Sequence, residues 1–271
     1  MSKYIQIEFQ NISKEQSEIL IADLAESGFE GFEEEETFLK AFIPENLFDE
    51  NLISKITTQQ NISYDKTVIE EINWNEVWES NFQPVIVDDF VAIRAHFHEP
   101  IQSMQFEIVI TPKMSFGTGH HATTYMMMQQ MRDIDFNDKS VFDFGTGTGV
   151  LAILAEKLGA REILGTDNDE WSITNATENT QRNNCSKIEL KLSSVVPEEN
   201  KFDIILANIN KNVILANVHL LKKQLKQNGV LLLSGLLIED KSDILSATDK
   251  LDLKLINSIE RNNWLSIRLS N

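Results

Sequence analysis

Hydrophobic and polar positions alternate with two different periods in the first seventy residues, which predicts a small domain of strands and helices. Every second position from Ile5 to Phe9 is apolar, as in a strand. Ser13 and Gln16 then form a capping-box pattern at the start of a helical spacing that ends at Gly28. The later elements are expected as two strands within 29–44, a helix over 46–60 and a strand over 62–69. The order βαββαβ predicts a ferredoxin-like α+β domain over residues 1–70.

A short segment with two tryptophans follows, and its spacing predicts a linker helix over residues 71–81. Trp74 and Trp78 are one helical turn apart and share one face. Aromatic side chains in such a position favour packing between domains, and contact with a substrate is the alternative interpretation.

From residue 82 onward the pattern changes, and it predicts a second domain over residues 82–271. Strands are expected at Val85–Ile93 and Gln105–Ile110, before a helix rich in methionines that we interpret as adaptable core filler. Strands and helices then alternate at 140–144, 150–158, 162–166, 170–183, 188–192, 202–207, 213–227 and 230–233. Two strands at 253–259 and 264–269 follow, and their short link implies an antiparallel pair. Such alternation is typical of a parallel sheet with helices on both faces.

The net charge of the chain limits the classes of partner that we expect it to bind. The 271 residues include 24 Lys and Arg against 42 Asp and Glu, which gives a formal net charge of −18. Phosphate-tracking proteins need clustered basic residues, so we expect no direct nucleic-acid partner. Residues 1–70 hold 15 acidic and 5 basic side chains. This first domain is therefore the expected docking surface for a basic protein.

Apolar runs and cysteine content indicate the compartment. The longest apolar run is far shorter than the roughly 20 residues of a membrane span, and the first residues lead into strand-like alternation rather than a signal-peptide core. Cys185 is the single cysteine, which fits a reducing compartment. We expect a cytoplasmic monomer that has no membrane partner.

A glycine-rich loop marks the first candidate ligand site. Asp143 precedes Gly145, Gly147 and Gly149 where the first strand of the alternation turns into a helix. Glycines there let the backbone approach a ligand closely at the carboxyl edge of the sheet. The third glycine comes one position too early for the dinucleotide fingerprint, which disfavours NAD. The arrangement instead resembles motif one of the S-adenosylmethionine-dependent methyltransferases, which implies that Asp143 orients the loop and meets the cofactor's ammonium, directly or through water.

The ends of the next strands supply further polar candidates. Asp167 can accept hydrogen bonds from both ribose hydroxyls, whereas Asp169 is expected to cap the following helix. Ser193 and Ser194 follow the third strand, where this fold contacts adenine. Asn208 ends the fourth strand and is positioned to meet a target nitrogen, and capping the next helix is the alternative for it.

The most distinctive stretch runs from Lys113 to Thr124, with two glycines, two histidines and a threonine pair before a helix. His120 and His121 are adjacent, so their side chains diverge, and no Asp, Glu or Cys is near in sequence. We therefore expect no metal site.

These motifs together resemble the PrmA family, the ribosomal protein L11 methyltransferases, over nearly the whole chain. The resemblance rests on Phe116-Gly117-Thr118-Gly119, Thr123-Thr124, the glycine loop, Asp167 and Ala207-Asn208-Ile209. It implies a Rossmann-like seven-stranded methyltransferase sheet behind a first domain that captures the substrate. It also implies that Thr124, Gly145, Asp167 and Asn208 contact S-adenosylmethionine. Ala122, Thr146 and Thr148 depart from the usual family residues without removing a functional group.

The implied activity is methylation of N-terminal and lysine amines on a basic ribosomal protein. Methyl transfer needs an aligned neutral amine rather than a nucleophilic residue of the enzyme. Deprotonating a lysine at pH 7 costs about 4 to 5 kcal/mol, and the sequence identifies no general base. We expect the proton to pass to water or a transient carboxylate while Asn208 orients the amine. The alternatives are methylation of another protein, a nucleic acid or a small molecule, and a non-catalytic binding module.

Overall fold

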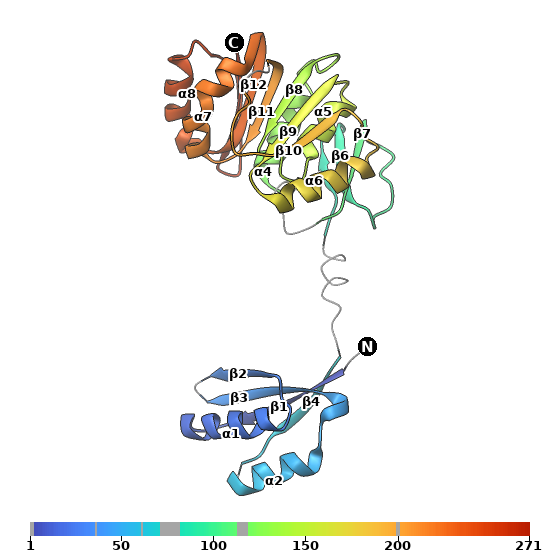
Figure 1. The fold of residues 1–271 in the computed structure, drawn as a ribbon, viewed down its shortest axis with the longest axis vertical. Coiled ribbons are helices and arrows are strands. Elements are labelled where there is room, and N and C mark those ends of the chain that lie inside the picture. The colour runs from blue at the N-terminus through green and yellow to red at the C-terminus, as the bar shows by residue number, and fades with distance from the viewer. Residues whose placement is uncertain (1–2, 36, 61, 71–81, 113–118, 199–200) are drawn as a thin grey trace. The chain divides into compact units, whose positions relative to one another are not determined.

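The computed structural model describes residues 3–35, 37–60, 62–70, 82–112, 119–198 and 201–271. The chain divides into two compact units, Met1–Asn81 and Phe82–Asn271, which we describe separately (Figure 1). The expected linker helix with Trp74 and Trp78 lies outside the described residues, as does the segment 113–118 with Phe116 and Gly117.

The first unit has the predicted ferredoxin-like topology. Its elements are β1 (Lys3–Gln10), α1 (Lys14–Glu26), β2 (Gly31–Glu35), β3 (Phe38–Pro44), a 3-10 turn (Glu45–Leu47), α2 (Glu50–Gln60) and β4 (Asp65–Glu70). The strands form one antiparallel sheet in the order β2-β3-β1-β4, with both helices on one face (Figure 1). Alternate β1 side chains, including Ile7 and Phe9, are fully buried against Leu20 and Leu24 of α1. The predicted capping box is confirmed, because the Gln16 amide donates to Ser13 Oγ.

The second unit is built on a seven-stranded, mostly parallel sheet, as predicted. Its main strands are β8 (Ser140–Phe144), β9 (Glu162–Asp167), β10 (Ile188–Leu192), β11 (Phe202–Asn208), β12 (Leu225–Leu237), β13 (Lys254–Arg261) and β14 (Trp264–Ser270). Its helices are α4 (Ala122–Met131), α5 (Val150–Lys157), α6 (Glu170–Arg182), α7 (Lys211–Gln224) and α8 (Lys241–Asp249), with a 3-10 turn at Ile238–Asp240. The strand order is β10-β9-β8-β11-β12-β14-β13, and only the pairings of β14 are antiparallel.

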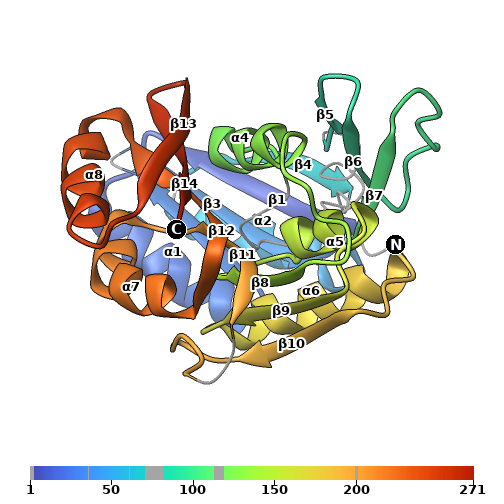
Figure 2. The same cartoon turned by 90° about the horizontal axis from the view of Figure 1, so that it is seen from above.

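Helices cover both faces of this sheet, which places two hydrophobic layers around buried strands. Val141 packs in the layer under α4 and α5, while its neighbour Phe142 packs in the opposite layer with α7 and α8 (Figure 2). Because both faces are covered, the central strands are largely apolar; all five residues of β8 are buried. Among the described residues, no helix has the length and apolar character needed to cross a membrane.

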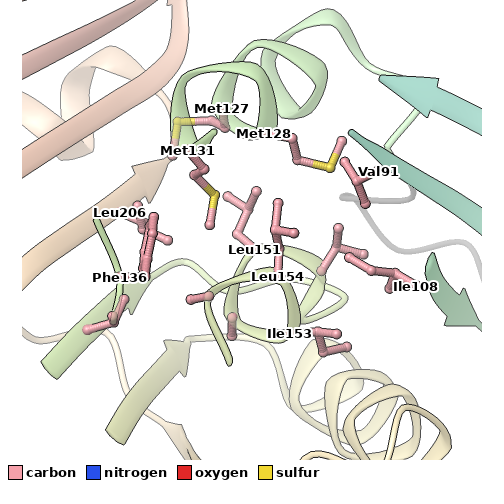
Figure 3. Close-up of a cluster of buried hydrophobic side chains, with 14 of the residues drawn as sticks. Val91, Ile108, Met127, Met128, Met131, Phe136, Leu151, Ile153, Leu154 and Leu206 are labelled. Atoms are coloured by element: carbon pink, nitrogen blue, oxygen red, sulfur yellow. The ribbon is translucent and has the colours of Figure 1, made fainter. Parts of the chain in front are cut away.

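The methionines of α4 belong to the core, as predicted. Met127, Met128 and Met131 are fully buried, and Figure 3 shows them above Leu151 and Leu154 of α5. Their unbranched side chains fill the space between α4, α5 and the sheet.

A separate three-stranded sheet corrects one sequence prediction. The expected single strand Val85–Ile93 is two strands, β5 (Val85–Val87) and β6 (Val91–Ala95), joined by a tight turn. The Phe90 amide closes this turn on the Val87 carbonyl at 3.0 Å, and Asp88 adopts a left-handed φ of 51°. β7 (Phe106–Ile110) pairs in parallel with β6.

The boundary between α7 and β12 is also displaced from the prediction. The helix expected to reach Gln227 ends at Gln224, and the strand expected at 230–233 already begins at Leu225. Leu225 is buried and pairs with Phe202, so tertiary pairing overrides the helical spacing.

The last two strands form the predicted antiparallel pair. Asn262 and Asn263 join β13 to β14 with φ values of 50° and 65°, the left-handed pair that a two-residue type I′ turn requires. β14 lies between β12 and β13 in the sheet.

Candidate functional site

A cavity of about 550 Å³ opens at the carboxyl edge of the large sheet. It lies where strands β8, β9, β11 and β12 end, the position at which open α/β sheets bind ligands. Its wall consists of His121, Thr123, Thr124, Gly145–Thr148, Val150, Leu151, Asp167–Asp169, Ser172, Asn208–Asn210, Gly235 and Trp264. Of the residues predicted for the site, Thr124, Gly145, Gly147, Asp167 and Asn208 therefore line one cavity.

The glycine loop lines the cavity with backbone atoms that no side chain covers. Gly145 has a φ of 78°, and a Cβ atom there would lie 2.3 Å from Ile209 Cγ2. The amides of Gly145 and Thr146 both donate to the Thr166 carbonyl at 2.8 Å, which fixes the loop to the end of β9. Only glycine at position 145 permits this approach without displacing Ile209.

Asp143 is located behind the loop instead of in the cavity wall. Its carboxylate is fully buried, and its Oδ2 atom accepts a 2.6 Å bond from the Thr146 hydroxyl. Its Oδ1 atom makes no hydrogen bond within the described part of the chain. Burial raises the pKa of Asp143 to about 7, and the nearby charge of Asp167 adds to this, while the Thr146 bond opposes it. The expected orienting contact to the loop is thus present, and contact with a ligand ammonium stays a prediction.

Asp167 connects two backbone segments at the rim. Its Oδ2 atom accepts from the Gly147 amide at 2.9 Å, and its Oδ1 atom accepts from the Asp169 amide at 3.1 Å. These bonds hold the partly exposed carboxylate at the cavity, where its remaining lone pairs can accept from hydroxyls. Asp169 caps α6 as predicted, because its side chain accepts from the Trp171 and Ser172 amides.

Asn208 and Thr124 meet across the cavity wall from two distant parts of the chain. Asn208 Nδ2 donates to Thr124 Oγ1 at 3.2 Å. No side chain or backbone group in the described ranges bonds to Asn208 Oδ1. The helix-cap interpretation of Asn208 is wrong, because Asn210 is the N-cap of α7 and accepts from the Val213 amide at 3.1 Å.

Sequence reasoning missed two residues of the cavity wall, which come from β12 and β14 of the large sheet. Gly235 has a φ of 82°, and a Cβ atom there would lie 2.3 Å from the Ile209 carbonyl oxygen, so β12 approaches the Asn208 loop closely. The Ile209 amide donates to the Ser234 carbonyl at 3.2 Å. Trp264 reaches the cavity because β14 is inserted beside β12.

The two adjacent histidines have different surroundings. The His120 ring packs edge-on against Phe82 at 4.8 Å, and its Nε2 atom lies 2.8 Å from the Gln83 carbonyl oxygen. His121 lines the cavity, with Nδ1 at 2.7 Å from Thr123 Oγ1. Within the described ranges, no group of three or more His, Cys, Asp or Glu residues could hold a metal ion.

Ser193 and Ser194 are outside the cavity wall. The Ser193 amide donates to the Asp167 carbonyl at 2.7 Å, and its hydroxyl interacts locally with Val195. Their contact with adenine stays a prediction.

The donor set fits S-adenosylmethionine better than a dinucleotide. The cavity has a carboxylate at the end of β9 for a ribose and a bare glycine loop, and behind that loop lies the buried Asp143 carboxylate, whose Oδ1 atom has no hydrogen bond in the described part of the chain. Its volume is within the range of small-molecule sites. The loop lacks the third glycine position of the dinucleotide fingerprint, which serves close packing of helix on strand.

Comparisons with known proteins agree with this geometry. The family model described as ribosomal protein L11 methyltransferase (PrmA) matches residues 3–271. A protein named ribosomal protein L11 methyltransferase from Porphyromonas gingivalis is 39% identical over 261 residues, covering 93% of this chain and 90% of its own length. A protein of the same name from Chlorobaculum tepidum is 37% identical over 276 residues, covering 97% and 95%. The crystal structure of ribosomal protein L11 methylase from Lactobacillus delbrueckii subsp. bulgaricus is 28% identical with a TM-score of 0.66, covering 70% of this chain and 99% of that one.

Proposed function

Because the chain belongs to the ribosomal protein L11 methyltransferase (PrmA) family, we propose that it methylates N-terminal and lysine amino groups of ribosomal protein L11. It is an S-adenosylmethionine-dependent methyltransferase. The observation that carries the choice of an amine acceptor is the orientation of Asn208. Its Nδ2 atom is engaged by Thr124, so its Oδ1 atom can accept a hydrogen bond from an amine in the cavity.

The cofactor side of the cavity is assigned to the glycine loop and Asp167. When bound, S-adenosylmethionine supplies a methyl group activated by a positive sulfur. Asp167 accepts hydrogen bonds from the ribose hydroxyls, while Gly145 and Gly147 present backbone to the cofactor. Thr124, at the start of α4, contacts the cofactor and at the same time fixes the Asn208 amide.

The acceptor side is assigned to Asn208 and the loop that follows it. In-line transfer requires the amine nitrogen about 3 Å from the methyl carbon with its lone pair directed at it. Asn208 Oδ1 accepts one N–H of the amine and thereby directs the lone pair. The close approach of Gly235 to Ile209 holds this loop in place, so little reorganisation is needed at the transition state.

The first unit is proposed to capture the basic substrate. The glutamates of β2, Glu33, Glu34 and Glu35, are exposed, and the excess of acidic side chains in residues 1–70 attracts a basic protein. Salt weakens such attraction, so substrate affinity should fall as ionic strength rises.

The test is methyl transfer to purified ribosomal protein L11 and to a ribosomal lysate, with radiolabelled S-adenosylmethionine. We expect label in one small basic protein. In single-turnover measurements Asn208→Ala should slow transfer about 10²-fold, by analogy with the loss of one preorganised hydrogen-bonding group. Asn212→Ala, an exposed position on α7 outside the cavity wall, is the matched control and should turn over normally. Label confined to other molecules, or full activity of the Asn208 variant, would contradict the proposal.

A further inference from the structure

An amine acceptor must lose a proton before methyl transfer, and the cavity wall contains few groups that can take it. In the described wall, the titratable side chains are His121, Asp167 and Asp169. Both oxygens of Asp167 accept backbone amides, and its remaining lone pairs are assigned to the ribose hydroxyls. Asp169 accepts the Trp171 and Ser172 amides and the Ser172 hydroxyl. His121 is therefore the wall residue with an available basic nitrogen.

The ring of His121 is held from two sides. Its Nδ1 atom lies 2.7 Å from Thr123 Oγ1, and its ring packs edge-on against Trp264 with centroids 4.5 Å apart. The Thr123 amide nitrogen also lies 3.4 Å from Nδ1, and this longer bond forms only when Nδ1 carries no proton. In the tautomer whose Nδ1–H donates to Thr123 Oγ1 at 2.7 Å, the lone pair is on Nε2. Nε2 has no hydrogen-bond partner among the residues that the structure describes.

The local chain places this imidazole at the same helix start as the residue that bonds Asn208. His121 is the N-cap of α4, and Thr124 in the first turn of the same helix receives the bond from Asn208 Nδ2. Trp264, the ring neighbour of His121, lines the same wall as Asn208. One short helix start therefore supports both the amide that orients the amine and the imidazole.

We propose that His121 is a catalytic residue that takes the proton of the acceptor ammonium on Nε2, an inference that rests on the proposed function. The ammonium N–H bond breaks, its proton binds His121, and its electron pair stays on the amine nitrogen. That pair forms the new bond to the methyl carbon while the methyl–sulfur bond breaks and its electrons neutralise the sulfur. The product amine carries one methyl group and a positive charge, and His121 returns its proton to solvent.

Several charged groups lie on the elements around His121. Asp167 and Asp169 share the cavity wall with it. The β13–β14 hairpin also contributes Arg261, whose guanidinium lies 3.7 Å from the Tyr125 ring centroid. Glu260 on β13 pairs with Lys241, and Asp88 beside β5 accepts a hydrogen bond from the Tyr125 hydroxyl.

The test compares the pH dependence of single-turnover methylation of ribosomal protein L11 in the unaltered chain and in His121→Asn. Asparagine is a good N-cap residue, so this variant should fold, yet it cannot accept the proton. We expect the rate near pH 7 to fall by about 10²-fold or more. The gap should narrow as pH rises, since a free amine needs no base. Calorimetry should give the same S-adenosylmethionine affinity within about twofold.

A second variant separates proton transfer from a structural effect. His121→Gly should regain rate when imidazole is added, because glycine is tolerated at the cap and leaves space beside Trp264. A rate gap that is the same at every pH, or no rescue by imidazole, would overturn the role of His121. Normal turnover of His121→Asn would also overturn it while leaving the proposed function intact. Failure of the unaltered chain to methylate the protein would overturn both.

Discussion

Replacing Asp143 by asparagine should change how the stability of the chain depends on pH. Asp143 is fully buried behind the glycine loop, and burial raises its pKa from 3.8 to about 7. A shift of about three units corresponds to about 4 kcal/mol of differential interaction. Asparagine has nearly the same shape and can still accept the Thr146 hydroxyl bond, but it never ionises.

The direction of this pH effect on stability follows from the protonation of Asp143 in the folded and in the unfolded chain. Below pH 3.8 the carboxyl is neutral in both folded and unfolded chains, so it imposes no ionisation cost on folding. As pH rises toward 7 the unfolded chain loses this proton while the folded chain retains it, so folding becomes progressively less favourable. Above about 7 both states are ionised, and the cost is constant. Asp143→Asn should therefore gain up to about 4 kcal/mol relative to the unaltered chain between pH 4 and pH 7.

Urea titrations of the full chain between pH 4 and pH 8 measure this difference. Asp249→Asn is the control, because it makes the same Asp-to-Asn change at an exposed position on α8. The prediction concerns the slope of the difference with pH and not its absolute size, because the amide group can also alter packing. A difference between Asp143→Asn and the unaltered chain that is the same at every pH would refute the reasoning.

Two further predictions concern the cofactor side of the cavity. Asp167→Ala should weaken S-adenosylmethionine binding about 10- to 150-fold in calorimetry, the loss of a hydrogen bond to a charged group, and unchanged affinity would show that the ribose binds elsewhere. Gly145→Ala and Gly28→Ala should each cost about 1–2 kcal/mol in denaturation, because both glycines have a left-handed φ, 78° and 92°. Only Gly145→Ala should also weaken cofactor binding, because its Cβ would lie 2.3 Å from Ile209 Cγ2 in the cavity wall. The Cβ at Gly28 would be 3.9 Å from its nearest neighbour, so Gly28→Ala is the control. Equal cofactor affinities for the two variants would contradict this prediction.

The parts of the site that depend on local sequence were predictable. The glycine loop, Asp167 and the Asp169 cap all follow directly from a strand that ends and a helix that begins. Asn208 and Asn210 were harder to separate, because both precede the same helix and asparagine is a good cap. Asn210 and not Asn208 is the N-cap of α7 because β11 continues through Asn208, which leaves Asn210 as the first residue able to cap the helix.

The remaining wall residues depend on long-range pairing and could not be read from the sequence. Gly235 and Trp264 reach the cavity through the insertion of β14 beside β12. The hairpin at Val85–Ile93 was missed because Asp88 and Asp89 interrupt an apolar run only briefly, and the turn is visible only in the pairing of β5 with β6. Leu225 likewise joins a strand because it is buried against β11, although its spacing continues the helix before it.

The placement of β14 between β12 and β13 sets an order for folding events. Among the described strands β13 pairs only with β14, so it cannot join the large sheet before β14 does. The Asn262-Asn263 turn makes this pair a local hairpin, and hairpins form in microseconds without waiting for distant segments. The docking of the hairpin on β12 is a long-range step that carries the larger loop-closure entropy. Because Trp264 begins β14, that one docking event completes both the edge of the sheet and the wall beside His121.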